Sequence, residues 1–308
     1  MNVSIVIPVY YNEETLGDLT KELMNVLNSN FDVKCYELIF VDDGSKDNSW
    51  KVLLELKKKF TNIIKLVRFS RNFGQVAAIY AGYKLAQYEL IITISADLQD
   101  PPNLINSMIE EYKKGFNIVI CHRKNREESL YRRVSSALFY WLMRKLSFSN
   151  MPEGGFDFLL ISSTVKNILI SNYDSNPFWQ GQILWTGFDF KLIPYTRLKR
   201  LSGKSRWSFS KKIKYLFDGM MSYSYTPIRL MTLIGLLVAA FGFVYAIVII
   251  LLKIFGDVPF KGWAPIMILI LILSGFQMLM LGIIGEYLWR ALDQVRHRPL
   301  YIIEEIHR

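Results

Sequence analysis

The chain has 308 residues and a formal net charge of +10, with 37 Lys and Arg residues against 27 Asp and Glu residues. This length allows one sizeable α/β domain together with a membrane segment. A net positive charge is compatible with nucleic acid, but the basic residues gather just before the first long apolar run, which favours anionic lipid headgroups instead. This basic cluster consists of Arg197, Lys199, Arg200, Lys204, Arg206, Lys211, Lys212 and Lys214. A solvated charged face is the alternative.

Short segments rich in β-branched residues alternate with helix-like segments in the first half of the chain. The predicted strands cover residues 3–9, 37–41, 90–94 and 117–120, and the predicted helices cover 15–27, 48–60, 75–85 and 103–113. This alternation is typical of βαβ units, so we predict an α/β fold with a mostly parallel sheet flanked by helices. Ligands of such sheets bind beyond the carboxyl ends of the strands.

Polar residues follow the predicted strands at that edge. They are Pro8, Tyr10, Asn12 and Glu13 after the first strand, Asp42, Asp43, Gly44 and Ser45 after the second, Arg71, Asn72, Phe73 and Gly74 further on, and Ser95 to Asp100. The sequence contains no glycine-rich dinucleotide loop and no P-loop, which disfavours a Rossmann oxidoreductase or an NTPase.

Two carboxylates follow the strand predicted at 90–94. Asp97 comes directly after it, and divalent cations prefer oxygen ligands that bridge a carboxylate to substrate phosphates. Asp97 is therefore a candidate ligand of Mg²⁺ or Mn²⁺. Asp100 precedes Pro101 and fits the N-cap position of the next helix.

Two apolar runs without charged residues occupy the end of the chain, at residues 230–252 and 264–285. At about 1.5 Å per residue, each can span a hydrocarbon core of roughly 30 Å. They predict transmembrane helices at about 230–252 and 264–287, and a pair of buried core helices is the alternative. Basic residues precede the first run, and Arg290, Arg296 and Arg298 follow the second. By the positive-inside rule both ends then lie in the cytoplasm.

Four motifs in order along the chain resemble those of family 2 glycosyltransferases. They are Ser-Ile-Val-Ile-Pro-Val-Tyr at 4–10, Val-Asp-Asp-Gly-Ser at 41–45, Arg-Asn-Phe-Gly at 71–74 and Ala-Asp-Leu-Gln-Asp-Pro-Pro at 96–102. With its C-terminal helix pair, the chain resembles the bacterial polyprenyl-phosphate glycosyltransferases, relatives of dolichol-phosphate mannose synthase. The resemblance implies a GT-A fold, a nucleotide-sugar donor and an inverting transfer.

The resemblance also implies site residues. The nucleotide-sugar pocket would be lined by Pro8, Tyr10, Asn12, Glu13, Asp42, Asp43, Gly44, Asn72, Gly74, Ala96 and Gln99, with Asp42 or Asp43 contacting the base or ribose. Asp97 corresponds to the second carboxylate of the family's D-x-D metal motif. Ser95 stands at the first position, so one negative charge is lost, and Gln99 and the donor diphosphate would supply further oxygens.

Further catalytic and acceptor-binding residues follow from the same resemblance. Asp157, within the Gly-Gly-Phe-Asp-Phe segment 154–158, would face the reacting centre as a base or an orienting group, and a turn or cap residue is the alternative. Arg200 and Lys204 would act in catalysis, and Arg123, Arg132 and Arg206 would contact the acceptor phosphate, with surface or lipid-headgroup contacts as the alternative. A polyprenyl phosphate is already ionised at neutral pH, because its second pKa is about 6, so it barely needs a base.

The expected organisation is a cytoplasmic catalytic domain at 1–200, a basic loop with an amphipathic interfacial helix at 201–227, two transmembrane helices within 228–290 and a cytoplasmic tail at 291–308. The expected function is metal-dependent transfer of a sugar, with UDP as the preferred nucleotide, to undecaprenyl phosphate at the cytoplasmic face of a bacterial membrane, for surface glycan modification. A flippase or a second copy of the chain is a possible partner.

Two alternatives remain open at this point. A polysaccharide synthase usually carries Gln-x-x-Arg-Trp, but Gly203 takes the place of the Gln before Arg206 and Trp207. A nucleotide-sugar-binding scaffold without turnover is kept open by Ser95. The sequence does not identify the sugar.

Overall fold

An eight-stranded sheet forms the centre of the protein, with the strand order β7-β5-β6-β4-β1-β2-β3-β8. The computed structural model describes residues 1–125, 141–145, 147–152, 155–172, 174–198, 218–255 and 263–308. The strands are β1 Asn2–Val9, β2 Cys35–Asp42, β3 Ile64–Phe69, β4 Leu90–Thr93, β5 Ile118–Asn125, β6 Phe158–Ser162, β7 Phe190–Thr196 and β8 Ile303–His307.

Parallel pairs outnumber antiparallel pairs in this sheet. The pairs β1–β2, β2–β3, β1–β4 and β5–β7 are parallel, whereas β6 pairs antiparallel with both β4 and β5, and β8 pairs antiparallel with β3. The predicted class, a mostly parallel sheet flanked by helices, is confirmed.

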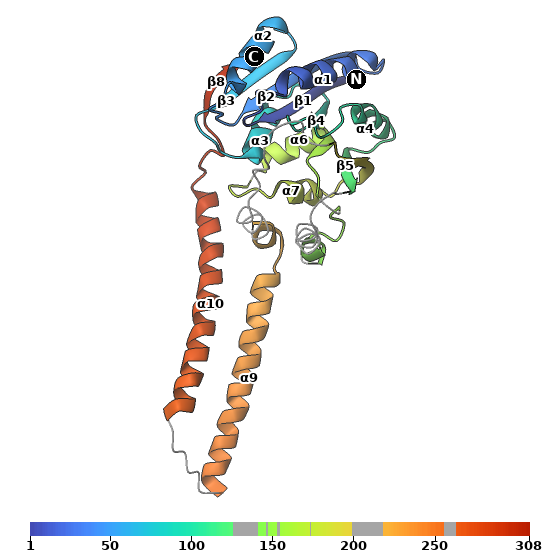
Figure 1. Ribbon diagram of the computed structural model, residues 1–308. Coiled ribbons are helices and arrows are strands. Elements are labelled where there is room, and N and C mark those ends of the chain that lie inside the picture. The colour runs from blue at the N-terminus through green and yellow to red at the C-terminus, as the bar shows by residue number, and fades with distance from the viewer. Residues whose placement is uncertain (126–140, 146, 153–154, 173, 199–217, 256–262) are drawn as a thin grey trace.

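Helices cover both faces of the sheet (Figure 1). One face packs against α1 Leu16–Ser29, α2 Ser49–Lys59 and α4 Leu104–Lys113, and the other against α3 Gln75–Leu85, α6 Ser163–Ser171 and α7 Trp179–Trp185. Ile5 and Ile7 of β1 belong to the first core and Val6 to the second. Burial on both faces explains why these strands are continuous apolar runs.

Helix α3 lies very close to β1. A Cβ atom added at Gly82 would lie 2.2 Å from Cγ1 of Val6, so only glycine permits this approach. The close packing places the start of α3, and the loop just before it, at the carboxyl-end edge of the sheet.

Two long helices, α9 Thr226–Phe255 and α10 Trp263–Val295, extend side by side away from the α/β domain (Figure 1). By length and composition both can cross a membrane, over Thr226–Leu251 and Ile268–Val295, and neither window is buried within the protein. Helix α10 continues past the predicted end near residue 287. Polar side chains of its last turns bind the α/β domain. Asp293 Oδ2 of α10, for example, accepts a hydrogen bond from Asn176 Nδ2 at 3.1 Å.

The segment 291–308, expected as a cytoplasmic tail, contains a strand that was not predicted from the sequence. Five of its residues form β8, which adds an antiparallel edge strand to β3. The chain therefore returns from α10 to the edge of the sheet formed by β3 (Figure 1). Of the predicted interfacial helix, residues 218–223 are helical, and the part before residue 218 lies outside the described residues.

Candidate active site

Loops at the carboxyl ends of β1 and β2 are joined to one another. The amide of Tyr11 donates to Ser45 Oγ at 3.0 Å, and the amide of Asn48 donates to Glu13 Oε2 at 2.8 Å. The Thr15 hydroxyl reaches across to the carbonyl of Ala96, after β4, at 2.6 Å. The chain adds β2 and β3 on one side of β1 and then β4 on the other. The loops thus surround the switch point at which ligands bind in open α/β sheets.

Asp43 fastens the loop of residues 71–74 to the end of β2. Its two carboxylate oxygens accept the backbone N–H of Phe73 at 2.6 Å and that of Gly74 at 2.9 Å. Burial raises the pKa of Asp43 to about 6, although these two hydrogen bonds oppose the rise. Gly44, at φ +69°, lies so close that a Cβ atom there would be 2.6 Å from the carbonyl carbon of Arg71. The two predicted nucleotide loops therefore form one unit.

Asp42 is fully buried beside this unit. It accepts the Ser45 amide at 3.2 Å, and its Oδ2 lies 3.7 Å from Nε of Arg68. Burial raises its pKa as well. Both carboxylates predicted to contact base or ribose thus hold other parts of the protein in place.

Ser95 stands between two carboxylates after β4. Its hydroxyl lies 2.8 Å from Asp97 Oδ1 and 2.6 Å from Asp100 Oδ2. Arg197, on the segment following β7, lies 3.5 Å from Asp97 and 3.6 Å from Asp100. Ser95 has a single hydroxyl proton and can donate to only one carboxylate at a time.

The prediction that Asp100 caps the next helix is wrong. Helix α4 begins at Leu104, its N-cap residue is Asn103, and no side chain caps it. A backbone turn through Pro101 separates the helix from Asp100, because the Leu104 amide donates to the Pro101 carbonyl at 3.2 Å. Asp100 is instead fully buried with its carboxylate in the site.

Tyr195 and Arg123 connect this cluster to Asp157. The Tyr195 hydroxyl donates to Asp100 and accepts from Arg123 Nε at 3.4 Å, and Arg123 Nη2 lies 3.1 Å from Asp157 Oδ2. Parallel pairing of β5 with β7 places Arg123 directly opposite Tyr195. Burial disfavours the guanidinium charge, but Asp157, Tyr195 and Asp100 together outweigh this effect and raise the pKa of Arg123.

The resulting chain of contacts runs from Asp97 to Asp157 and spans the end of the sheet. Its members are Asp97, Ser95, Asp100, Tyr195, Arg123 and Asp157, in that order. The sequence pointed to Asp97, Arg123 and Asp157 but missed Tyr195, and it placed Arg197 only among lipid-facing basic residues. A local pattern that would single out Tyr195 does not exist, because its role depends on strand pairing.

The remaining predicted site residues differ in their contacts and exposure. Gln99 Nε2 donates to the Leu198 carbonyl at 3.2 Å, and Asn72 is exposed. Pro8 lies in β1 next to the loop that begins at Tyr10, whose amide donates to Asn12 Oδ1 at 2.9 Å. Arg132, Arg200, Lys204 and Arg206 lie outside the described residues.

The donor atoms near β4 suit a hard cation. No group of three or more His, Cys, Asp or Glu side chains suited to a metal occurs in the part of the chain that the structure describes. The oxygens of Asp97, Asp100 and Ser95 nevertheless lie together, and oxygen sets of this kind bind Mg²⁺ or Mn²⁺ when a substrate phosphate completes the coordination.

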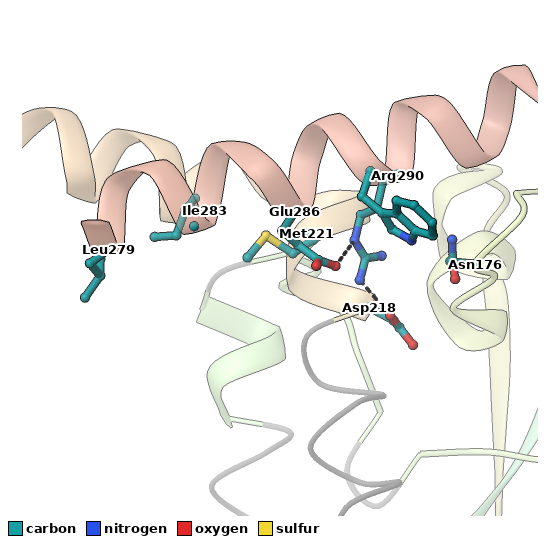
Figure 2. Close-up of a pocket in the computed structure, with 9 residues that line it drawn as sticks. Asn176, Asp218, Met221, Leu279, Ile283, Glu286 and Arg290 are labelled. Atoms are coloured by element: carbon teal, nitrogen blue, oxygen red, sulfur yellow. Dashed lines mark hydrogen bonds and ion pairs between the residues drawn. The ribbon is translucent and has the colours of Figure 1, made fainter. Parts of the chain in front are cut away.

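A separate cavity of about 540 Å³ lies where α10 meets the domain, and it shares no lining residue with the carboxylate cluster (Figure 2). Arg290 projects from α10 into it and binds two carboxylates, with Nη2 2.7 Å from Asp218 and Nε 2.9 Å from Glu286. Apolar side chains such as Leu279 and Ile283 line it further along the same helix. The Arg290–Asp218 ion pair joins α10 to residues 218–223, whereas the Arg290–Glu286 pair lies within α10.

The sequence matches the family model described as glycosyl transferase family 2 over residues 4–165. It is 37% identical to an uncharacterized glycosyltransferase, YkcC, of Bacillus subtilis, with 98% of this chain and 93% of that protein covered. It is 33% identical to the SfII prophage-derived bactoprenol glucosyl transferase of Shigella flexneri, over 100% and 99% of the two chains. It is 32% identical to the undecaprenyl-phosphate 4-deoxy-4-formamido-L-arabinose transferase of Photorhabdus laumondii, over 99% and 94%.

Proposed function

The chain belongs to glycosyl transferase family 2, and from this premise we propose that it transfers a single sugar from a UDP-sugar to undecaprenyl phosphate. The observation that carries the proposal is the end-to-end similarity to a bactoprenol glucosyl transferase, which includes the two apolar C-terminal helices. A polyprenyl phosphate is held in a bilayer, so an enzyme acting on it benefits from a membrane anchor next to its active site.

We assign the donor nucleotide to the switch point between β1 and β4. The joined loops 8–13, 42–45 and 71–74 supply backbone and side-chain polar groups there, and they are held by contacts within the protein. Such preorganised loops bind a ligand with little ordering cost. Asp43 then acts on the nucleotide through the position of Phe73 and Gly74.

Asp97, with Ser95 and Asp100 beside it, would hold Mg²⁺ or Mn²⁺ in this assignment. A divalent cation bound there would offset the negative charge of the donor diphosphate and of the departing UDP. Asp100 restores the negative charge that Ser95 removes from the D-x-D pattern, because both carboxylates approach the same hydroxyl.

The transfer is a single displacement. An oxygen of the acceptor phosphate forms a bond to the anomeric carbon while the bond from that carbon to the donor phosphate oxygen breaks, and UDP departs with the electron pair. The attacking phosphate is already largely ionised at pH 7, with a second pKa of about 6, so no base has to remove a proton. We therefore give Asp157 an orienting role, since it holds the Arg123 guanidinium at 3.1 Å.

The catalytic domain lies in the cytoplasm in this proposal. Basic residues flank the helix pair on the domain side, and α10 leads back to the sheet through β8. The ends of both helices nearest the domain then lie at headgroup depth, where the acceptor phosphate is found.

The test uses membranes that contain the full chain, undecaprenyl phosphate, Mn²⁺ and radiolabelled UDP-glucose or UDP-N-acetylglucosamine. Label should enter the organic phase with the wild type and with Asp18→Asn, an exposed carboxylate of α1. Asp97→Asn should lower the rate by about 10²-fold or more, as expected for loss of an electrostatic group in the site.

Three other outcomes would contradict parts of this proposal. UDP binding without transfer of any sugar would support a binding scaffold, and a product with more than one sugar would support a polysaccharide synthase. Equal rates for Asp97→Asn and Asp18→Asn would remove Asp97 from the cation site.

A further inference from the structure

The C-terminal strand contacts the part of β3 that leads into the loop of residues 71–74. In the β3–β8 pairing Phe69 lies opposite Ile303, and the Ser70 amide then donates to the Ile302 carbonyl at 3.1 Å. Arg71 follows immediately, so the residue just before β8 is hydrogen-bonded to the chain one residue before this loop begins. The other end of β8 lies next to α2, where the centroid of the His307 ring is 5.9 Å from that of Trp50.

Tyr301 makes the side-chain part of this contact. Its ring stacks on Phe69 with centroids 4.9 Å apart and planes 12° from parallel, and Phe69 packs edge-on against Phe73 at 5.8 Å. Phe73 is the residue whose amide donates to Asp43. A continuous row of three aromatic rings thus leads from the segment after α10 to the loop anchored on Asp43.

A charged contact runs beside this row. Arg68 lies 3.7 Å from Asp42 and also 3.7 Å from Glu304, which is the residue left over at the irregularity in the β3–β8 pairing. The side chain of Glu304 is half-exposed, and an ion pair of that kind contributes little to stability. Among the side-chain contacts, the aromatic row is therefore the one that reaches the loop.

We propose that Tyr301 is a positioning residue for the nucleotide loop at 71–74, acting through Phe69 and Phe73. Through it, the segment that follows α10 sets the geometry of the loop, which ties the sugar-nucleotide half of the active site to the C-terminal helix. The proposal rests on the proposed nucleotide role of this loop, and its structural part stands independently.

The test compares variants at the two ends of the C-terminal segment in the full-length protein. Tyr301→Ala removes the ring that stacks on Phe69, whereas Tyr301→Phe keeps it. His307→Ala weakens the same strand at the end remote from the loop and serves as the matched control. Tyr301→Leu replaces the alanine variant if that variant does not fold, because it keeps apolar bulk without the ring stack.

Hydrogen exchange of the Phe73 and Gly74 amides is the first measurement, since both donate to Asp43. Their exchange should be at least about fivefold faster in Tyr301→Ala than in the wild type, Tyr301→Phe and His307→Ala, with α3 and β1 unchanged. The second measurement is UDP affinity by calorimetry, which should weaken about two- to tenfold in Tyr301→Ala only.

The outcomes separate this proposal from the proposed function. Unchanged exchange at Phe73 and Gly74, or equal effects of Tyr301→Ala and His307→Ala, would overturn the positioning role and leave the transferase intact. A wild type that binds no UDP would refute the donor assignment, and the exchange of the two amides would still decide whether Tyr301 positions the loop.

Discussion

The hydroxyl of Tyr195 donates a hydrogen bond to Asp100 although the two residues are 95 positions apart in the sequence. The same oxygen accepts from Arg123, which holds Asp157. One buried hydroxyl thereby joins the carboxylate cluster after β4 to the arginine–aspartate pair at the other side of the sheet.

Tyr195→Phe should therefore break the hydrogen-bonded connection between these two groups without leaving a cavity in the core. The phenyl ring fills the same space, but Asp100 and Arg123 each lose a polar partner. We expect the free energy of unfolding to fall by about 1.5–3 kcal/mol, the usual net contribution of a hydrogen bond to a charged group. The transfer rate should fall about tenfold or more, whereas UDP affinity should change less than twofold.

Initial rates and UDP calorimetry check this expectation, with Tyr36→Phe as the control, because Tyr36 donates only to the surface residue Asn28. A wild-type transfer rate in Tyr195→Phe would show that the connection between the two groups is not needed for turnover.

The pH dependence of UDP binding should follow Asp43. Its pKa is raised to about 6 in the folded protein, and the ionised form accepts both backbone N–H groups of the 71–74 loop. As the pH falls through 6, the carboxyl gains a proton, loses part of its acceptor capacity and holds the loop less firmly, so UDP affinity should decrease.

The contribution of Asp43 to folding stability has the opposite sign. Because its folded pKa lies above the ordinary value of 3.8, the folded state binds the proton more tightly. The stabilising contribution of Asp43 is therefore fully present below about pH 4 and is lost as the pH rises through 6.

The prediction for UDP binding is checked by calorimetry between pH 5.5 and 7.5. The affinity for UDP should rise with pH in the wild type, and it should be weaker and independent of pH in Asp43→Asn.

Arg290 should be important for the junction between α10 and the domain. Its guanidinium binds Asp218 and Glu286, and the side chains of Arg290 and Asp218 are only 16% and 14% exposed. Arg290→Met leaves the Asp218 carboxylate without its cation in a mostly buried site, which should lower stability by about 2–4 kcal/mol.

Thermal unfolding in detergent micelles checks this value against Arg229→Met, which removes an exposed arginine from α9. A double-mutant cycle with Asp218→Asn should recover part of the loss, because the uncompensated charge is then gone. Equal melting temperatures for Arg290→Met and Arg229→Met would contradict the assignment.

The two cysteines provide a test of membrane orientation. Cys35 is exposed at the start of β2, whereas Cys121 is buried in β5, and burial raises the pKa of its thiol. A maleimide that cannot cross membranes should therefore react with Cys35 alone. For a cytoplasmic domain, it should label inside-out vesicles and leave intact cells unlabelled, and Cys35→Ser should remove the signal. Labelling of intact cells would place the domain on the outer side.

Many of the strands and helices could be predicted from local sequence patterns. The strands β1, β2, β4 and β5 and the helices between them were found because burial on both faces makes such strands continuously apolar, and α9 and α10 were found from the length of their apolar runs. Strands β3, β6, β7 and β8 were missed. Strands β6 and β8 are only five residues long, and each pairs with a strand that is far from it in the sequence.

By itself, the sequence determined the α/β class, the apolar helix pair, the family and the loops in which polar residues follow strands, because these depend on composition and neighbouring residues. Only the tertiary structure decided that Asp100 joins the site rather than capping α4, that Tyr195 bridges it to Arg123, and that Tyr301 returns from α10 to stack on Phe69. These roles depend on strand order and register. Pairing between segments far apart in the chain is set by the packing of the whole sheet, and no local stretch of residues encodes it.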